Sequence, residues 1–298
     1  MKRFELSTLT IPQRHGLLLG AVGPRPIAFA STIDAQGRPN LSPFSFFNIF
    51  GSNPPTLIFS PARRGRDNTT KDTLHNVEAV PEVVINVVTW DLVHQATLSS
   101  TEYPAGVNEF EKAGLTMLPS ERIRPFRVKE SPVQLECVVK QVVHTGDSGA
   151  AGNLVICEAL VMHVREDLLN DKGLIDQRRI DLVARMGGHF YCRAHGDALF
   201  ELPQPTTHVG MGVDALPRDI RESGVLTGRD LAKLADRSAE PDAAAVNEHR
   251  STSIASVFQE HAGDPKNLHD ALHRHAHALL EKDRVDEAWM TLLAYNEH

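Results

Sequence analysis

Cysteine is scarce in this sequence. Three occur among 298 residues, Cys137, Cys157 and Cys192, and no two of them form a C-x-x-C pair. An odd, sparse set of this kind argues against a disulfide framework and against a cysteine-ligated zinc site. We therefore expect reduced, buried thiols in a cytoplasmic protein.

Long apolar runs and an excess of positive charge are also missing. No run approaches the roughly 18 apolar residues that a membrane-spanning helix needs, and the N-terminal MKRFELSTLTIPQ lacks the continuous apolar core of a secretory signal. The 31 Lys and Arg residues against 38 Asp and Glu leave a formal net charge of −7. We expect neither a membrane protein nor a dedicated nucleic-acid binder.

The pattern of the chain changes near Pro205. Residues 1–204 hold many short apolar and β-branched runs, few helical patterns and no alternation of strand with helix. This predicts a mainly β, antiparallel barrel with short helices. Residues 205–298 carry helical spacing and predict a helical C-terminal extension. Within that extension, residues 237–251 are expected to form a flexible linker.

Turn residues divide the first part into strands and two short helices. Residues 40–50 are expected as the return strand after 25–33, with Pro43 at an edge or a bulge. A Gly-rich hairpin joins the two longest strands, and Thr69 or Thr70 is expected to cap the first helix. The predicted strands span 25–33, 40–50, 56–60, 81–88, 131–146 and 153–167, and the predicted helices 69–80 and 92–100.

The segment SPARRGRDNTTKDT (60–73) concentrates positive charge between a strand and a helix. Guanidinium and ammonium groups, neutral donors and the N–H groups at a helix start are what a phosphate group needs. A solvated basic loop is the alternative, and composition leaves both open. The charged residues are Arg63, Arg64, Arg66 and Lys71, and the neutral ones are Ser60, Asn68, Thr69, Thr70 and Thr73.

Phenylalanines crowd into NLSPFSFFNIFGSNPP (40–55), together with Ser45 and Asn48. Strand alternation would send Phe44 and Phe46 to one face and Phe47 to the other. Such a segment suits a flat aromatic ligand whose polar edge meets nearby hydroxyl, amide or backbone groups. Taken alone, the composition favours an ordinary apolar core.

Two further patterns resemble ligand motifs but lack their context. Residues 210–215 fit G-x-G-x-x-A, yet no strand–helix–strand unit surrounds them, so we expect no dinucleotide site there. His269, His273 and His277 recur at intervals of four, a spacing that can bind a divalent metal. No carboxylate or cysteine partner is in register with them, and we expect a solvated polar face and no metal.

Several ordered segments resemble the flavin reductase-like family, whose members are FMN-binding split β-barrels of antiparallel, Greek-key type. The resemblance runs from about residue 15 to about 200 and implies a flavin-binding domain over 1–204. It also implies a homodimer with one FMN per subunit near the interface. The segments are GPRPIAFASTIDAQGRPN (23–40), SPFSFFN (42–48), Asn53-Pro54-Pro55, Lys71-Asp72-Thr73, VINVV (84–88) and LVARMGGHFYCR (182–193).

The resemblance also implies roles for individual residues. Arg25 would approach the flavin, and His189 would either contact a nicotinamide or be a structural turn residue. The isoalloxazine would lie along Ser45, Phe46, Phe47 and Asn48. The phosphate would meet Ser60, Lys71 and Thr73, with Arg63, Arg66 and Thr70 close by.

From these features we expect an NAD(P)H-dependent flavin reductase, in which a nicotinamide donates hydride to flavin N5. The chemistry then belongs to the cofactor, which explains the lack of an evident acid–base pair or nucleophile. The electron acceptor is unassigned, and a partner monooxygenase fits. The alternatives are an FMN-binding electron carrier with no NAD(P)H site and a flavin-free interaction module that uses the acidic helical tail.

Overall fold

The computed structural model describes residues 1–104, 106–202 and 208–295. The chain forms two compact units, Met1–Phe200 and Glu201–His298, each with its own apolar core. None of the helices in these ranges has both the length and the apolar character needed to cross a bilayer.

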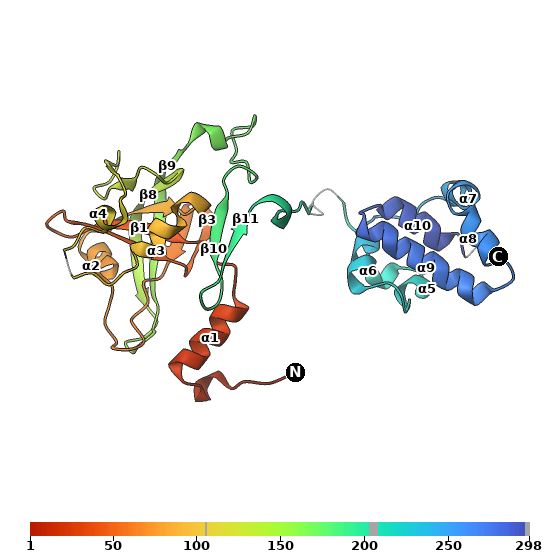
Figure 1. Ribbon diagram of the computed structural model, residues 1–298, viewed down its shortest axis with the longest axis horizontal. Helices are drawn as coiled ribbons and strands as arrows, with labels where there is room; N and C mark the ends of the chain where they lie inside the picture. The colour runs from red at the N-terminus through yellow and green to blue at the C-terminus, as the bar shows by residue number, and fades with distance from the viewer. Residues whose placement is uncertain (105, 203–207, 296–298) are drawn as a thin grey trace. The chain divides into compact units, whose positions relative to one another are not determined.

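The first unit is built on one antiparallel sheet of seven strands (Figure 1). Their order across the sheet is β2-β1-β5-β8-β9-β4-β3. The strands are β1 (Ala28–Ile33), β2 (Pro39–Phe44), β3 (Phe47–Ser52), β4 (Pro55–Phe59), β5 (Glu82–Val87), β8 (Val133–His144) and β9 (Asn153–Val164).

The connection between β2 and β3 shows that the sheet curls into a barrel. These strands stand at opposite ends of the sheet order, yet only Ser45 and Phe46 separate them in the chain. Two residues bridge so short a distance only if the two sheet edges approach each other. The prediction of one continuous strand over 40–50 is therefore wrong, because the chain bends there and changes edge. Pro43 does lie in an edge strand, as predicted.

Every residue of β1 is buried, and the strand contributes to two cores. Ala28 and Ala30 join one apolar cluster, while Phe29 joins another on the opposite face. The helix α2 (Asp72–Ala79) covers the first cluster through Val77. The helices α3 (Val93–Leu98) and α4 (Glu109–Ala113) cover the second. The period-two alternation of a strand thus places helices on both faces of the sheet.

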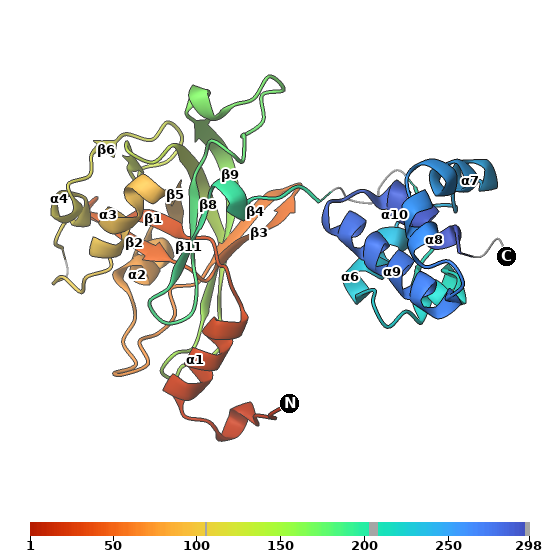
Figure 2. The same ribbon diagram turned by 45° about the vertical axis from the view of Figure 1, so that its right-hand side comes forward.

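An N-terminal helix, α1 (Ile11–Ala21), was not foreseen from the sequence. Thr10 and Gln13 form a capping box at its start, and Pro12 lies in its first turn. Near its end, Gly20 packs against Gly187 in the turn between β10 (Leu182–Arg185) and β11 (Tyr191–Ala194). A Cβ on Gly187 would lie 3.0 Å from Gly20 Cα, so glycine permits the close approach. Figures 1 and 2 both show α1 beside this hairpin.

The remaining short strands of the first unit are β6 (Met117–Leu118) and β7 (Arg127–Val128), which pair with each other.

In the second unit, the long amphipathic helix α9 packs with α10 around the fully buried Trp289. Trp289 Nε1 donates a hydrogen bond to the carbonyl of Leu234 at 3.0 Å. The α-helices of the second unit are α5 (Arg218–Arg221), α6 (Gly228–Ala235), α7 (Ala243–Thr252), α8 (Ala255–Glu260), α9 (Pro265–Glu281) and α10 (Val285–Leu293).

Residues 237–251 are not a flexible linker, because most of them belong to α7. Asp242 caps the helix by accepting a hydrogen bond from the N–H of Ala245 at 2.8 Å. Val246 and His249 are buried, and His249 Nε2 lies 2.9 Å from Thr291 Oγ1. The Ala-rich composition that suggested a linker is also a favourable helix composition, and tertiary contacts decide between the two.

Candidate functional site

The basic segment after β4 is an ordered loop held by its own arginine. Arg63 Nε donates to Asn68 Oδ1 at 2.7 Å, and Arg63 Nη2 donates to the Asn68 carbonyl at 2.8 Å. Asn68 adopts a left-handed backbone conformation, and its amide donates to the carbonyl of Asp147 in the β8–β9 hairpin at 2.9 Å. Arg63 therefore braces the loop against the barrel.

A carboxylate that sequence reasoning did not single out balances the other two arginines. Glu102 accepts a hydrogen bond from Arg64 Nε at 3.1 Å and another from Arg66 Nη2. These contacts lower the pKa of Glu102, the Arg66 hydrogen bond being the larger cause. Arg64 Nη1 also donates to Thr69 Oγ1 at 2.9 Å. No local sequence signal marks Glu102, because it lies more than 30 residues from the loop it contacts.

Lys71 stands apart from the arginines. Its side chain is half-buried at the N-terminus of α2, and within the described residues its ammonium has no hydrogen bond or ion pair. Burial lowers the pKa of Lys71, and the nearby Arg64 guanidinium lowers it further. An ammonium in this setting gains from an anion beside it.

The first turn of α2 adds to this positive environment. Lys71 occupies the N-cap position and its side chain makes no capping hydrogen bond. The expected caps are wrong: Thr69 Oγ1 donates to Asp67 Oδ1 at 2.7 Å, and Thr70 Oγ1 lies 2.7 Å from His75 Nε2. Among the residues that the structure describes, the first N–H groups of α2 consequently have no side-chain acceptor, which is the arrangement that binds anions at helix starts. Beside them is a small cavity lined partly by Arg64, Lys71 and Thr73, with the carboxylates of Asp72, Glu102 and Glu109 also in its wall.

Two neutral residues of the predicted phosphate site, Ser60 and Thr73, are buried and fix the walls of this corner. Ser60 Oγ accepts a hydrogen bond from the N–H of Asn153 at 3.0 Å. Thr73 Oγ1 donates to Asn40 Oδ1 at 2.8 Å, which joins α2 to β2. Both hydroxyl groups thus already have protein partners, and their contact with a phosphate stays a prediction.

The bend between β2 and β3 is the second predicted constellation. Phe44 and Phe47 pack in the same core cluster, whereas Phe46 is 41% exposed with its ring edge-on to His15 of α1. The predicted alternation fails here because the chain leaves the strand conformation at Ser45 and Phe46. Asn48 is exposed and accepts a hydrogen bond from the N–H of Ile49 at 2.8 Å.

One backbone hydrogen bond brings the aromatic bend and the basic loop together. The N–H of Ser60 donates to the carbonyl of Phe46 at 2.8 Å. An exposed aromatic ring at a bend and a cationic corner at a helix start thus belong to one region of the barrel. This arrangement fits an elongated ligand with a flat ring system at one end and a phosphate at the other.

The two remaining candidates have different surroundings. The guanidinium of Arg25 is buried and donates to the carbonyls of Leu19, Val22 and Met186. It therefore joins α1 to the β10–β11 hairpin, and its expected contact with a flavin stays a prediction. His189 is exposed in the turn of that hairpin, which is compatible with either of its expected roles.

A curled antiparallel sheet of this order, with a cationic loop beside an aromatic bend, defines a split β-barrel of the flavin reductase type. The chain belongs to the flavin reductase-like family, whose model, described as the flavin reductase like domain, matches residues 21–181. The resemblance and the fold class expected from the sequence are confirmed.

The chain is also similar to individual known proteins. An uncharacterized protein of Aquifex aeolicus is 38% identical over 183 residues, which cover 61% of this chain and 91% of that protein. Nitrilotriacetate monooxygenase component B from Bacillus cereus is 31% identical with a TM-score of 0.63, covering 68% of this chain and 98% of that chain. The 2-nitrobenzoate 2-nitroreductase of Pseudomonas fluorescens is 28% identical with a TM-score of 0.62, covering 71% and 100%. The family and these neighbours support flavin-related oxidoreductase chemistry.

Proposed function

We propose that this protein is an NAD(P)H-dependent FMN reductase whose phosphate site is the corner formed by Lys71, Arg64 and the start of α2. The observation that carries the proposal is the half-buried Lys71 ammonium, which forms no hydrogen bond or ion pair within the described residues although Glu102 and Asp72 are near enough to act on its charge. A phosphate monoester would pair with this ammonium and accept hydrogen bonds from both it and the first N–H groups of α2.

When bound, the flavin supplies the redox chemistry by accepting hydride from a nicotinamide at N5. The protein's part is to bind and orient the cofactor. In this proposal, Phe46 and the backbone of the bend from Ser45 to Asn48 hold the ring system. Arg63 keeps the loop ordered, and Glu102 fixes the directions of Arg64 and Arg66.

A comparison of two ligands tests the phosphate assignment directly. FMN and riboflavin share the ring system and differ by the phosphate, so a phosphate contact affects only the binding of FMN. We expect Lys71→Gln to weaken FMN binding by about 1–3 kcal/mol, roughly 5- to 150-fold, and to leave riboflavin binding unchanged. The exposed Lys172 offers a matched control through Lys172→Gln. Fluorescence quenching titrations measure all of these affinities.

Equal losses for FMN and riboflavin would show that Lys71 acts on the fold or on the ring, and would refute the phosphate assignment. Steady-state oxidation of NADH and NADPH then tests the reductase. We expect turnover by the FMN-loaded protein alone with one of the two nucleotides. Negligible turnover with both would favour the electron-carrier alternative, and protein that binds no flavin would favour the interaction module.

We further propose that the barrel unit forms a homodimer. Within the described residues, α1 buries none of its side chains. Large apolar side chains are also exposed on β3, where Ile49 is 62% and Phe50 is 64% exposed, and at the hairpin turn, where Phe190 is 76% exposed. Apolar surface of this kind is typical of a protein interface. Sedimentation equilibrium should show a dimer that Phe50→Glu dissociates; a monomeric native protein would refute this proposal.

The family relation also bears on the domain organisation and on the electron acceptor. We propose that residues 1–204 form the flavin-binding domain and residues 205–298 a helical extension to it. Because one structural neighbour is the component B of a monooxygenase, we propose a separate monooxygenase as the acceptor of reduced flavin. The three free cysteines fit a cytoplasmic location.

A further inference from the structure

The histidines of α9 do not form the solvated polar face expected from the sequence. His273 is fully buried, His269 and His277 are partly buried, and His275 is the only exposed histidine on α9. The rings of His269 and His273 stack with their centroids 4.0 Å apart. Two imidazoles at an interval of four residues have the spacing with which helices present two ligands to one metal ion.

A carboxylate from another helix completes this cluster. One ligand atom each from Asp219, His269 and His273 lie within 4.8 Å of one another. Asp219 belongs to α5, some 50 residues before the histidines, so the folding of α5 against α9 brings the three together. This is the partner whose absence from the local sequence argued against a metal.

The Nδ1 atom of each ring already has a partner. His273 Nδ1 lies 2.7 Å from Ser223 Oγ, which is itself held by the N–H groups of Val225 and Leu226 at 3.1 Å each. His269 Nδ1 lies 3.4 Å from Asp270 Oδ1. Metal-ligating histidines characteristically use one ring nitrogen for an outer partner of this kind and the other for the metal.

The other ring nitrogen of His273, Nε2, lacks a partner in the part of the chain that the structure describes. His273 Nε2 is buried and has no hydrogen-bond partner within the described residues. Buried polar atoms are rarely left in this state without a ligand, an ion or water beside them.

We propose that Asp219, His269 and His273 form a binding site for a divalent first-row transition metal in the helical unit, with Zn²⁺ as the ion best suited to two imidazoles and a carboxylate. Three protein ligands leave a coordination position open in a tetrahedral site. His269 retains 27% exposure of its side chain, which gives the ion a route to the site from solvent.

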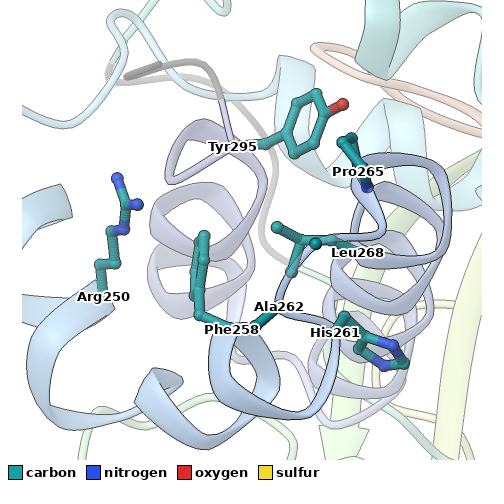
Figure 3. A pocket seen from close by; sticks show the side chains of 8 residues that line it. Arg250, Phe258, His261, Ala262, Pro265, Leu268 and Tyr295 are labelled. Carbon is teal, nitrogen blue, oxygen red and sulfur yellow. The ribbon is translucent and has the colours of Figure 1, made fainter.

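A cavity lies near the cluster. The ring of Tyr295 meets the ring of His269 edge-on, with centroids 5.1 Å apart, and also lines a cavity of about 520 Å³. Figure 3 shows Tyr295 and Pro265 beside Leu268 at the start of α9, across the cavity from Arg250. The proposed metal thus lies one aromatic ring away from a cavity large enough for a small molecule.

The test titrates Zn²⁺ into the untagged full chain after removal of metal with EDTA, using isothermal titration calorimetry. We expect one saturable site per chain. His269→Ala and Asp219→Asn should each weaken Zn²⁺ binding at least tenfold, and His275→Ala, an exposed histidine on the same helix, should leave it unchanged. Co²⁺ should give visible absorption bands of a four-coordinate site in the native protein, and these should be lost in His269→Ala.

Circular dichroism without metal shows whether each variant is folded, and FMN content reports separately on the barrel unit. If His269→Ala fails to fold, the Zn²⁺ affinity of Asp219→Asn tests the site in its place. Zn²⁺ should also raise the melting temperature of the native chain and not that of Asp219→Asn. Native protein without a saturable Zn²⁺ site would overturn the proposal. So would equal Zn²⁺ affinity in the native chain, His269→Ala and Asp219→Asn, because the ion would then bind other surface histidines.

Discussion

The buried guanidinium of Arg25 offers a test of what holds the N-terminal helix to the barrel. Arg25 donates to Leu19 and Val22 at the end of α1 and to Met186 in the β10–β11 turn, at 3.0 Å for Leu19 and 2.9 Å for Met186. Since α1 buries none of its own side chains within the described residues, these bonds are a large share of its attachment. We expect Arg25→Met to release α1 while the barrel stays folded.

The magnitude follows from these three bonds. Hydrogen bonds from a charged donor contribute about 1.5–3 kcal/mol each, a gross loss of roughly 4–9 kcal/mol. Two effects reduce the net value. Burial disfavours the charged guanidinium, which together with Arg185 lowers the pKa of Arg25, and the released carbonyls at the exposed helix end can bind water. We therefore expect a net loss of about 2–4 kcal/mol in the local stability of α1.

Amide hydrogen exchange measures this local stability directly. A loss of 2–4 kcal/mol corresponds to a fall of about 30- to 700-fold in the protection of residues 11–21. Arg25→Lys should give an intermediate loss, because an ammonium keeps the charge but cannot reach three carbonyls with one planar group. Unchanged protection in Arg25→Met would refute this reasoning. Weaker FMN binding together with unchanged protection would instead support the direct flavin contact that the family resemblance implies.

Three further predictions concern the barrel unit. Gly187→Ala places a methyl group 3.0 Å from Gly20 Cα, and we expect it to lower the free energy of unfolding in urea by about 1–3 kcal/mol. Gly16→Ala, with open space around it, should be neutral or stabilising by up to about 1 kcal/mol, and equal losses would contradict the close approach. Glu136→Gln should lower the free energy of unfolding by about 2–4 kcal/mol at pH 7, because the buried carboxylate accepts from the N–H of Arg122 at 2.7 Å and lies 2.8 Å from His163 Nε2. Burial alone would raise the pKa of Glu136, but these contacts and the N–H of Glu121 bring it below its ordinary value of 4.5. The native state then binds fewer protons than the unfolded state, so the advantage of the native protein should be constant above about pH 5 and shrink as the pH falls through the lowered pKa; a difference that grows in acid would contradict this assignment. Finally, a chain ending at Phe200 should keep the FMN affinity of the full chain, and loss of flavin would place the helical extension in the site.

The strands that could be predicted from the sequence are those whose patterns are local. The two apolar segments that form β8 and β9 are long and rich in β-branched residues, with glycine between them, and both strands form as expected. The basic loop was recognisable because strand, loop and helix follow one another in the chain. The errors lie where a distant contact decides the local conformation, as at Ser45 and Phe46, where the closure of the barrel divides one apolar run into strands on opposite edges.

The class of this protein can be recognised from the order of its residues, because ordered motifs and alternating apolar residues depend on neighbours along the chain. Which charges of the basic loop are already neutralised depends on the folded chain, since Glu102 reaches Arg64 and Arg66 across more than 30 residues. The same holds for His273, which a helical period alone could not assign to core or solvent. Its environment comes from Ser223 and Asp219 on the preceding segments, and such contacts exist only after the chain has folded.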